Sequence, residues 1–126
     1  MMMPKITKAV DTAEFYTEER CFIRELSNSP QDKELSVALA RVEKGVTTEW
    51  HALKGTVERY LIVKGEAIVE LEGLMPSSIC SGDMVEIPVG CRQRITNTGD
   101  SDLIFYAICT PRFKLENYLG SLHFFP

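Results

Sequence analysis

Glycines recur at intervals of eight to ten residues between positions 45 and 99, and this spacing constrains the fold more than any other feature. Turn residues at such intervals, with apolar or β-branched runs between them, are typical of an all-β sandwich or barrel. The glycines of this series are Gly45, Gly55, Gly65, Gly73, Gly82, Gly90 and Gly99. The apolar runs predict strands at 21–26, 35–42, 60–63, 67–71, 84–87 and 103–109. Helical periodicity is confined to a short run at 115–122.

Length and charge exclude several classes of protein. A chain of 126 residues has the size of one domain with its own core. Its net charge of -4 and its scattered basic residues argue against a nucleic-acid partner. No apolar run approaches the roughly 18 to 20 residues that span a bilayer, and charged residues interrupt any signal-like segment at the N-terminus. We therefore expect a cytoplasmic protein without a membrane partner.

The cysteines indicate neither a metal knuckle nor a redox pair. Cys21, Cys80, Cys91 and Cys109 are widely spaced, and no two of them form a Cys-x-x-Cys pair. We expect all four to be small buried hydrophobic residues in a reducing compartment.

One of the only two histidines lies in a spaced motif. Gly45 is followed after five residues by His51, and Leu53 stands two positions further on. Four residues then separate Leu53 from Glu58, and six separate Glu58 from Gly65. A possible ligand pair, His51 and Glu58, therefore lies within a segment of predicted strands.

A second spaced motif follows after 16 residues. Gly82 is followed after five residues by Pro88 and Gly90, then after two residues by Gln93 and after three more by Asn97. Together the two motifs extend over 53 residues in consistent register.

Both motifs resemble those of the cupin superfamily, in particular its small single-domain bacterial members. The resemblance implies an all-β, RmlC-like fold, a double-stranded β-helix or jelly-roll barrel. We expect a single domain over 1–126, with a barrel core at 35–113. Residues 1–20 are predicted to form an N-terminal extension, and residues 114–126 a C-terminal tail.

The resemblance also implies a metal site, with departures. Metal-dependent cupins bind a divalent ion through two histidines and a glutamate of the first motif and a histidine of the second. Here Leu53 and Gln93 replace two of the histidines. The predicted metal ligands are His51, Glu58 and Gln93, for zinc, iron, nickel or manganese. Alternatively, His51 donates a hydrogen bond to Glu58 and no metal binds.

Strand geometry predicts which side chains share the interior with His51 and Glu58. Side chains two residues apart point to the same face of a strand, and the turn before Gln93 leads into the same space. The predicted pocket residues, besides the ligands, are Glu49, Leu53, Ile62 and Cys91, together with Tyr60. A concave apolar pocket with a few polar groups is typical of a small-molecule site.

Two classes of function follow. The first is a metal-dependent enzyme acting on a small polar metabolite, in which Glu58 or Tyr60 moves a proton; an isomerase, a lyase and a dioxygenase all suit the fold. The second is a non-catalytic module that binds a sugar-like small molecule without metal. The sequence favours the enzyme, because sensing modules usually act through an attached domain.

The last residues predict contact with another surface. His123 precedes Phe124 and Phe125, and adjacent aromatic side chains at a terminus are expected to dock on the barrel or on a second subunit. Together with strands that are apolar on both faces, this tail predicts a homodimer.

Overall fold

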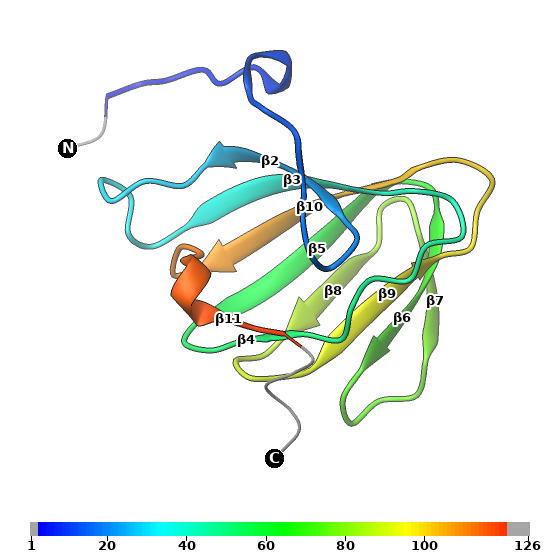
Figure 1. The fold of residues 1–126 in the computed structure, drawn as a ribbon. Coiled ribbons are helices and arrows are strands. Elements are labelled where there is room, and N and C mark those ends of the chain that lie inside the picture. Colours follow the sequence, from blue (N-terminus) through cyan, green and yellow to red (C-terminus); the bar gives the residue numbers. More distant parts are fainter. Residues whose placement is uncertain (1–2, 121–126) are drawn as a thin grey trace.

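The computed structural model describes residues 3–120 and shows an all-β protein whose strands all pair antiparallel, as the sequence predicts (Figure 1). Six strands form the large sheet, in the order β1 (Phe15–Tyr16), β2 (Phe22–Ser27), β3 (Ser36–Val42), β10 (Leu103–Thr110), β5 (Val57–Lys64) and β8 (Met84–Ile87). No helix in this part of the chain is long and apolar enough to cross a membrane.

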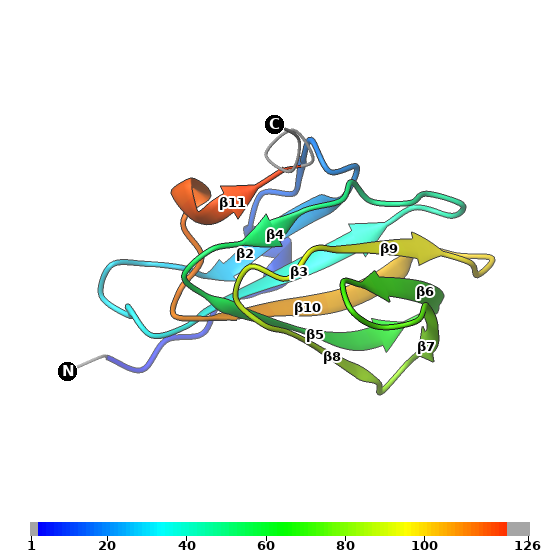
Figure 2. The same cartoon turned by 90° about the horizontal axis from the view of Figure 1, so that it is seen from below.

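Two smaller sheets form a second layer that faces the large one (Figure 2). The first contains β7 (Ser77–Cys80), β6 (Glu66–Leu71) and β9 (Gln93–Asn97), and the second contains β11 (Tyr118–Leu119) and β4 (Ala52–Leu53). A backbone bridge connects the two small sheets, because the N–H groups of His51 and Gln93 each donate to the carbonyl of the other residue, at 3.0 and 2.8 Å. This pairing brings the two sequence motifs together.

The strand predictions are confirmed most closely at 84–87, which is β8. Strand β5 is longer than predicted at both ends. The short helical periodicity at 115–122 forms no α-helix in its described part: a single 3-10 turn, η2 (Leu115–Asn117), is followed by β11, which pairs with β4. Tertiary pairing outweighs the weak helical pattern there. A second 3-10 turn, η1 (Ala9–Asp11), lies near the N-terminus.

The hydrophobic core fills the space between the layers. Along β5, Glu58, Tyr60 and Ile62 are buried while the intervening side chains point outward, as alternation requires. Tyr60 packs against Phe105 with a distance of 4.4 Å between ring centroids. Glu58 lies in the next row of the interior face, directly opposite Cys109 of β10. Along this face of β5, hydrophobic core residues therefore end at Tyr60, and Glu58 is the first polar residue beyond them.

The prediction that all four cysteines are buried is partly wrong. All four thiols are free, and Cys21 and Cys109 are buried, but Cys91 is half-buried and Cys80 is exposed. Cys80 ends the edge strand β7, where one face is open to solvent.

The predicted docking tail, with His123, Phe124 and Phe125, lies outside the described residues. The outer face of the large sheet exposes Leu61, Val63 and Met84. The homodimer stays a prediction.

Candidate functional site

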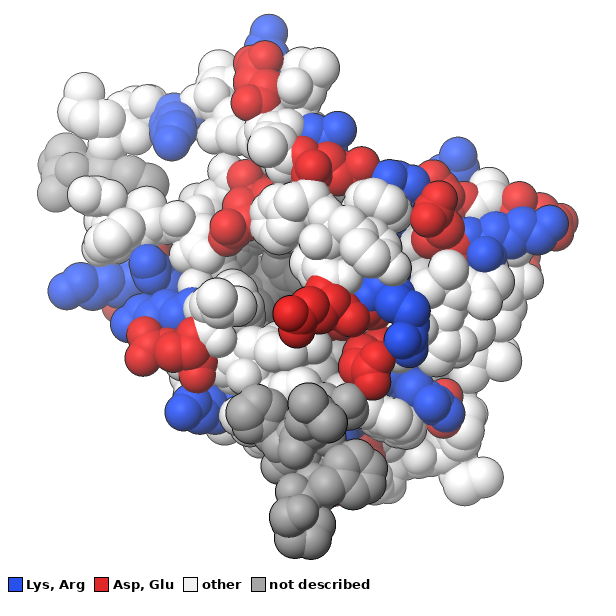
Figure 3. All heavy atoms as spheres, in the orientation of Figure 1, with Lys and Arg blue, Asp and Glu red and all other residues white. Residues whose placement is uncertain are grey.

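A cavity of about 500 Å³ opens between the large sheet and the segment that carries β4 and β11. Glu58 and Cys109 line it from the large sheet, and His51 and Leu53 line it from the opposite layer. Residues 15–19 close one side. In the space-filling view this face of the molecule has a central hollow with acidic side chains around it (Figure 3).

Glu58 is held at the bottom of this cavity by two fully buried neighbours. The Tyr60 hydroxyl donates to Gln93 Oε1 at 2.7 Å, and Gln93 Nε2 donates to Glu58 Oε1, also at 2.7 Å. The other carboxyl oxygen of Glu58, Oε2, lies 3.8 Å from the thiol of Cys109. Because the Gln93 amide is fixed at both ends, it sets the orientation of the Glu58 carboxyl group.

Burial raises the pKa of Glu58 from its ordinary value of 4.5 to about 7. Removal from water is the largest cause, because it disfavours the charged carboxylate. The positive charge available on His51 opposes this change, while the negative charge of Glu19 adds to it. The carboxyl group therefore gains and loses its proton near neutral pH.

His51 is fixed on three sides. Its Nδ1 lies 2.8 Å from the backbone carbonyl oxygen of Glu49, which can only accept, so Nδ1 carries the proton. Its Nε2 lies 3.2 Å from Oε2 of Glu19. The ring of Tyr118 stacks on the imidazole, with a centroid distance of 5.4 Å and an angle of 18° between the planes. The imidazole therefore presents Nε2 towards Glu19.

Sequence reasoning did not find Glu19 and Tyr118. Glu19 belongs to the predicted extension 1–20, yet its carbonyl accepts the N–H of Glu49 at 3.0 Å. The Arg20 side chain donates to the Thr47 carbonyl at 2.9 Å and to Glu49 Oε2 at 2.9 Å. These contacts join residues about thirty positions apart, and no local pattern signals them. The N-terminal segment thus completes the site.

Glu49, Ile62 and Cys91 do not line this cavity, in contrast to the predicted pocket, whereas Leu53 does. Strict alternation does not hold around His51, because β4 spans only two residues and His51, Ala52 and Leu53 are consecutively buried. The Glu49 carboxylate pairs with Arg20 near the surface. Ile62 belongs to the core, and the half-buried Cys91 packs against it.

The side chains present do not fit the predicted three-ligand metal site. Leu53 has no lone pair to offer, and the Gln93 side-chain oxygen already accepts a hydrogen bond from the Tyr60 hydroxyl. Within residues 3–120, no group of three or more His, Cys, Asp or Glu side chains is arranged to hold a metal ion. His51 and Glu58 remain as an imidazole and a carboxyl group that line the cavity.

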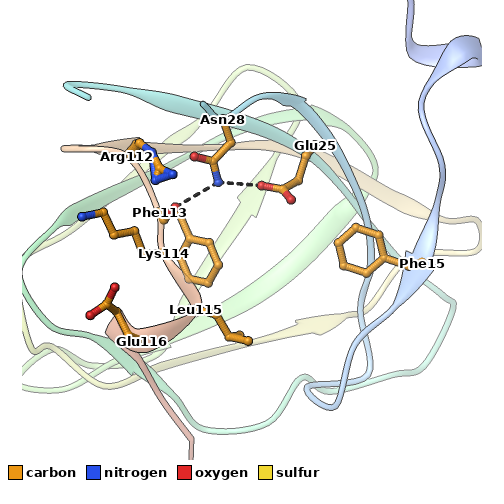
Figure 4. Close-up of a pocket in the computed structure, with 8 residues that line it drawn as sticks. All are labelled: Phe15, Glu25, Asn28, Arg112, Phe113, Lys114, Leu115 and Glu116. Atoms are coloured by element: carbon orange, nitrogen blue, oxygen red, sulfur yellow. Dashed lines mark hydrogen bonds between the residues drawn. The ribbon is translucent and has the colours of Figure 1, made fainter. Parts of the chain in front are cut away.

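A second, adjoining groove of about 630 Å³ shares Phe15, Glu25, Phe113 and Leu115 with the cavity. Figure 4 shows its residues, with the side-chain amide of Asn28 between Glu25 and Phe113. Asn28 Nδ2 donates to Glu25 Oε2 at 2.7 Å and to the Phe113 carbonyl at 2.9 Å. The groove therefore extends the mouth of the cavity along the edge of the large sheet.

The two facing antiparallel layers and the site between them define the cupin fold, and the predicted resemblance is confirmed at the level of the fold. KdgF from Halomonas sp. superposes with a TM-score of 0.75 at 16% identity, over 86% of this chain and 96% of that one. A predicted oxalate decarboxylase from Thermotoga maritima has a TM-score of 0.76 at 21% identity, covering 85% and 99%. Pac13 is a nucleoside dehydratase, and a Streptomyces Pac13 variant has been solved with uridine. Pac13 has a TM-score of 0.78 at 13% identity, over 94% of this chain and 91% of that one.

No protein-family model matches the sequence, and no curated protein is similar to it. At identities of 13 to 21%, the structural similarity establishes the fold alone. Solved proteins with this fold include enzymes that act on small molecules.

Proposed function

We propose that this protein is a small-molecule enzyme in which Glu58 exchanges a proton with a ligand bound in the cavity. One observation carries the proposal: a buried carboxyl group stands at the bottom of a cavity of about 500 Å³, with Oε1 held by Gln93. Its Oε2 is the oxygen available to a ligand. A cavity of this size suits a small metabolite.

The proposed step is an isomerisation or an elimination of water. The Glu58 carboxylate accepts a proton from a C–H group beside a carbonyl, and the electron pair of that bond moves towards the carbonyl oxygen. In the isomerisation of a hydroxy ketone, the former carbonyl carbon takes up the proton while the hydroxyl proton moves to the former carbonyl oxygen. In a dehydration, the electron pair returns from the oxygen and expels a hydroxyl group from the neighbouring carbon, which takes up the proton and leaves as water. A pKa of about 7 suits both halves, because both protonation states are populated near neutral pH.

Tyr60 is a positioning residue in this proposal. Its hydroxyl donates to Gln93, and its buried side chain does not line the cavity. It orients the glutamine amide that holds Glu58, and its side chain also acts on the pKa of Glu58 directly, which it lowers. Pac13, a nucleoside dehydratase with the same fold, supports the proposal, because dehydration is one of the two reactions proposed for this protein.

Hydrogen–deuterium exchange at carbon tests the proposal. The protein is incubated in D₂O with a panel of hydroxy ketones, amino ketones and nucleosides, and NMR spectroscopy follows the carbon-bound protons. For a compound that exchanges, Glu58→Gln is expected to slow exchange by about 100-fold or more. The matched control is Glu86→Gln, which removes the same charge from the outer face of β8. Exchange that persists in Glu58→Gln would refute the role of Glu58, and binding without exchange would assign a binding module.

The metal dependence predicted from the resemblance is tested separately. Protein purified without an affinity tag is subjected to elemental analysis, together with a His51→Ala variant. The observed side chains lead us to expect no stoichiometric metal in either preparation. Stoichiometric metal that disappears in His51→Ala would replace the proposed chemistry with a metal-dependent mechanism.

A further inference from the structure

Among the described residues, the cavity is lined by acidic side chains and by no lysine or arginine. Three glutamates near its mouth accompany the buried one, and His51 is the one basic side chain that this part of the chain contributes. The four are Glu18, Glu19, Glu25 and Glu58. The space-filling view shows acidic side chains beside the central hollow of this face (Figure 3).

Elsewhere on the protein, many carboxylates are neutralised by arginines. The pairs with N–O distances below 3.5 Å are Arg20 with Glu49, Arg41 with Glu14 and Asp102, Arg59 with Glu86, and Arg94 with Glu70. Within residues 3–120, none of the four cavity carboxylates forms an ion pair with a lysine or arginine. Arg112 and Lys114 line the adjoining groove but not the cavity. In the described part of the chain, His51 is therefore the one basic side chain that pairs with a cavity carboxylate, that of Glu19.

Glu19 gives an independent indication of a ligand. Its Oε2 is shielded from solvent and accepts no hydrogen bond from any described residue. His51 Nε2 lies 3.2 Å away and pairs with this oxygen only when the imidazole carries a second proton. A buried acceptor left without a donor costs about 1–3 kcal/mol, and a ligand N–H group at this point would remove that cost.

Aromatic side chains border the same space. Phe15, Tyr16, Phe113 and Tyr118 line the cavity together with the glutamates. The face of an aromatic ring carries a negative partial charge and attracts organic cations, so that aromatic and carboxylate groups together favour an ammonium group. Neither group favours an anion.

We propose that the cavity selects a small organic cation, with an ammonium group that donates to Glu19 and contacts the aromatic residues at the mouth. This inference rests on the proposed function, since it names the substrate class of the same site. It also distinguishes this protein from a decarboxylase of oxalate, because a dianion would meet glutamates and no lysine or arginine among the described residues that line the cavity. The reacting part of such a ligand extends towards Glu58.

A set of three probes of similar size and different charge tests the inference: benzylamine, benzyl alcohol and benzoate. Binding to the full-length protein is measured by NMR titration near neutral pH. Benzylammonium is expected to bind about tenfold more tightly than either of the others, and more weakly at high salt. Glu19→Gln is expected to weaken its binding about fivefold or more, because the carboxylate is largely shielded from water.

Two further variants keep the test decisive. Glu18→Gln removes an exposed charge at the mouth and is expected to weaken benzylammonium binding even if Glu19→Gln does not fold. Glu86→Gln, on the outer face, is expected to leave it unchanged. Tighter binding of benzoate or benzyl alcohol, or binding that ignores both cavity variants, would overturn the cationic substrate class while leaving the small-molecule site intact. Failure of all three probes to bind would count against the site and the proposed function together.

Discussion

Replacing Glu58 by glutamine is expected to change how the stability of the protein depends on pH. The pKa of Glu58 is raised from 4.5 to about 7 in the folded protein, so between these values the folded state holds a proton that the unfolded chain has lost. The stabilisation by the protonated carboxyl is fully present below about pH 4.5 and is lost as the pH rises towards 7. Glutamine resembles the protonated acid in shape and carries no charge.

The magnitude follows from the difference between the two pKa values. At about 1.4 kcal/mol for each pKa unit, the shift from 4.5 to about 7 corresponds to about 3 kcal/mol. The quantity to compare is the free energy of unfolding of Glu58→Gln minus that of the unmodified protein. This difference should rise by about 3 kcal/mol between about pH 4.5 and about pH 8. The titratable groups that interact with Glu58 include His51, Glu19, Tyr60, Cys109, Cys21 and Tyr118, and all are present in both proteins.

Urea-induced unfolding at a series of pH values measures this difference. Glu86→Gln is the control, because its carboxylate is exposed and should keep the pH dependence of the unmodified protein. If the curves of Glu58→Gln and the unmodified protein run parallel from about pH 4.5 to about pH 8, the carboxyl is not desolvated as described and the reasoning fails.

Three other substitutions test separate parts of the site. Tyr60→Phe removes the donor to Gln93 Oε1 and should lower the free energy of unfolding by about 1–3 kcal/mol, measured by urea unfolding; no change would show that the amide finds another partner. The double variant Leu53→His with Gln93→His restores the donors of the cupin motif and should bind zinc stoichiometrically by calorimetry, which unchanged metal content would contradict. Arg20→Ala breaks an exposed pair and should cost less than about 1 kcal/mol of stability, yet weaken amine binding through movement of Glu19; unchanged affinity would show that the segment holds its place without Arg20.

Much of the fold follows from the sequence because turn spacing and apolar runs are local signals. Gly65 illustrates their physical origin: its φ is 102°, and an added Cβ would lie 3.2 Å from the backbone of Leu103. Such a position requires glycine at the turn between β5 and β6. The convergence of His51, Glu58 and Gln93 likewise follows from two motifs in register.

The rest of the site depends on contacts between distant residues. Glu19 and Tyr118 come from segments outside the predicted barrel, and each reaches His51 only through the folded chain. The role of Gln93 was also beyond sequence reasoning: the resemblance placed it among metal ligands, whereas its amide connects Tyr60 to Glu58. A side chain with both a donor and an acceptor suits either role, and only the neighbours distinguish them.

The floor and the rim of the cavity differ in how readily they unfold locally. The floor belongs to β3, β5 and β10, which are seven or eight residues long, whereas the rim includes β1, β4 and β11, each of two residues. Short pairings of this kind open locally at low free energy, while long central strands open only with the whole domain. Laboratory evolution towards new ligands should therefore concentrate on the rim, where insertions and exchanged loops would reshape access and leave the proton-transfer group in place.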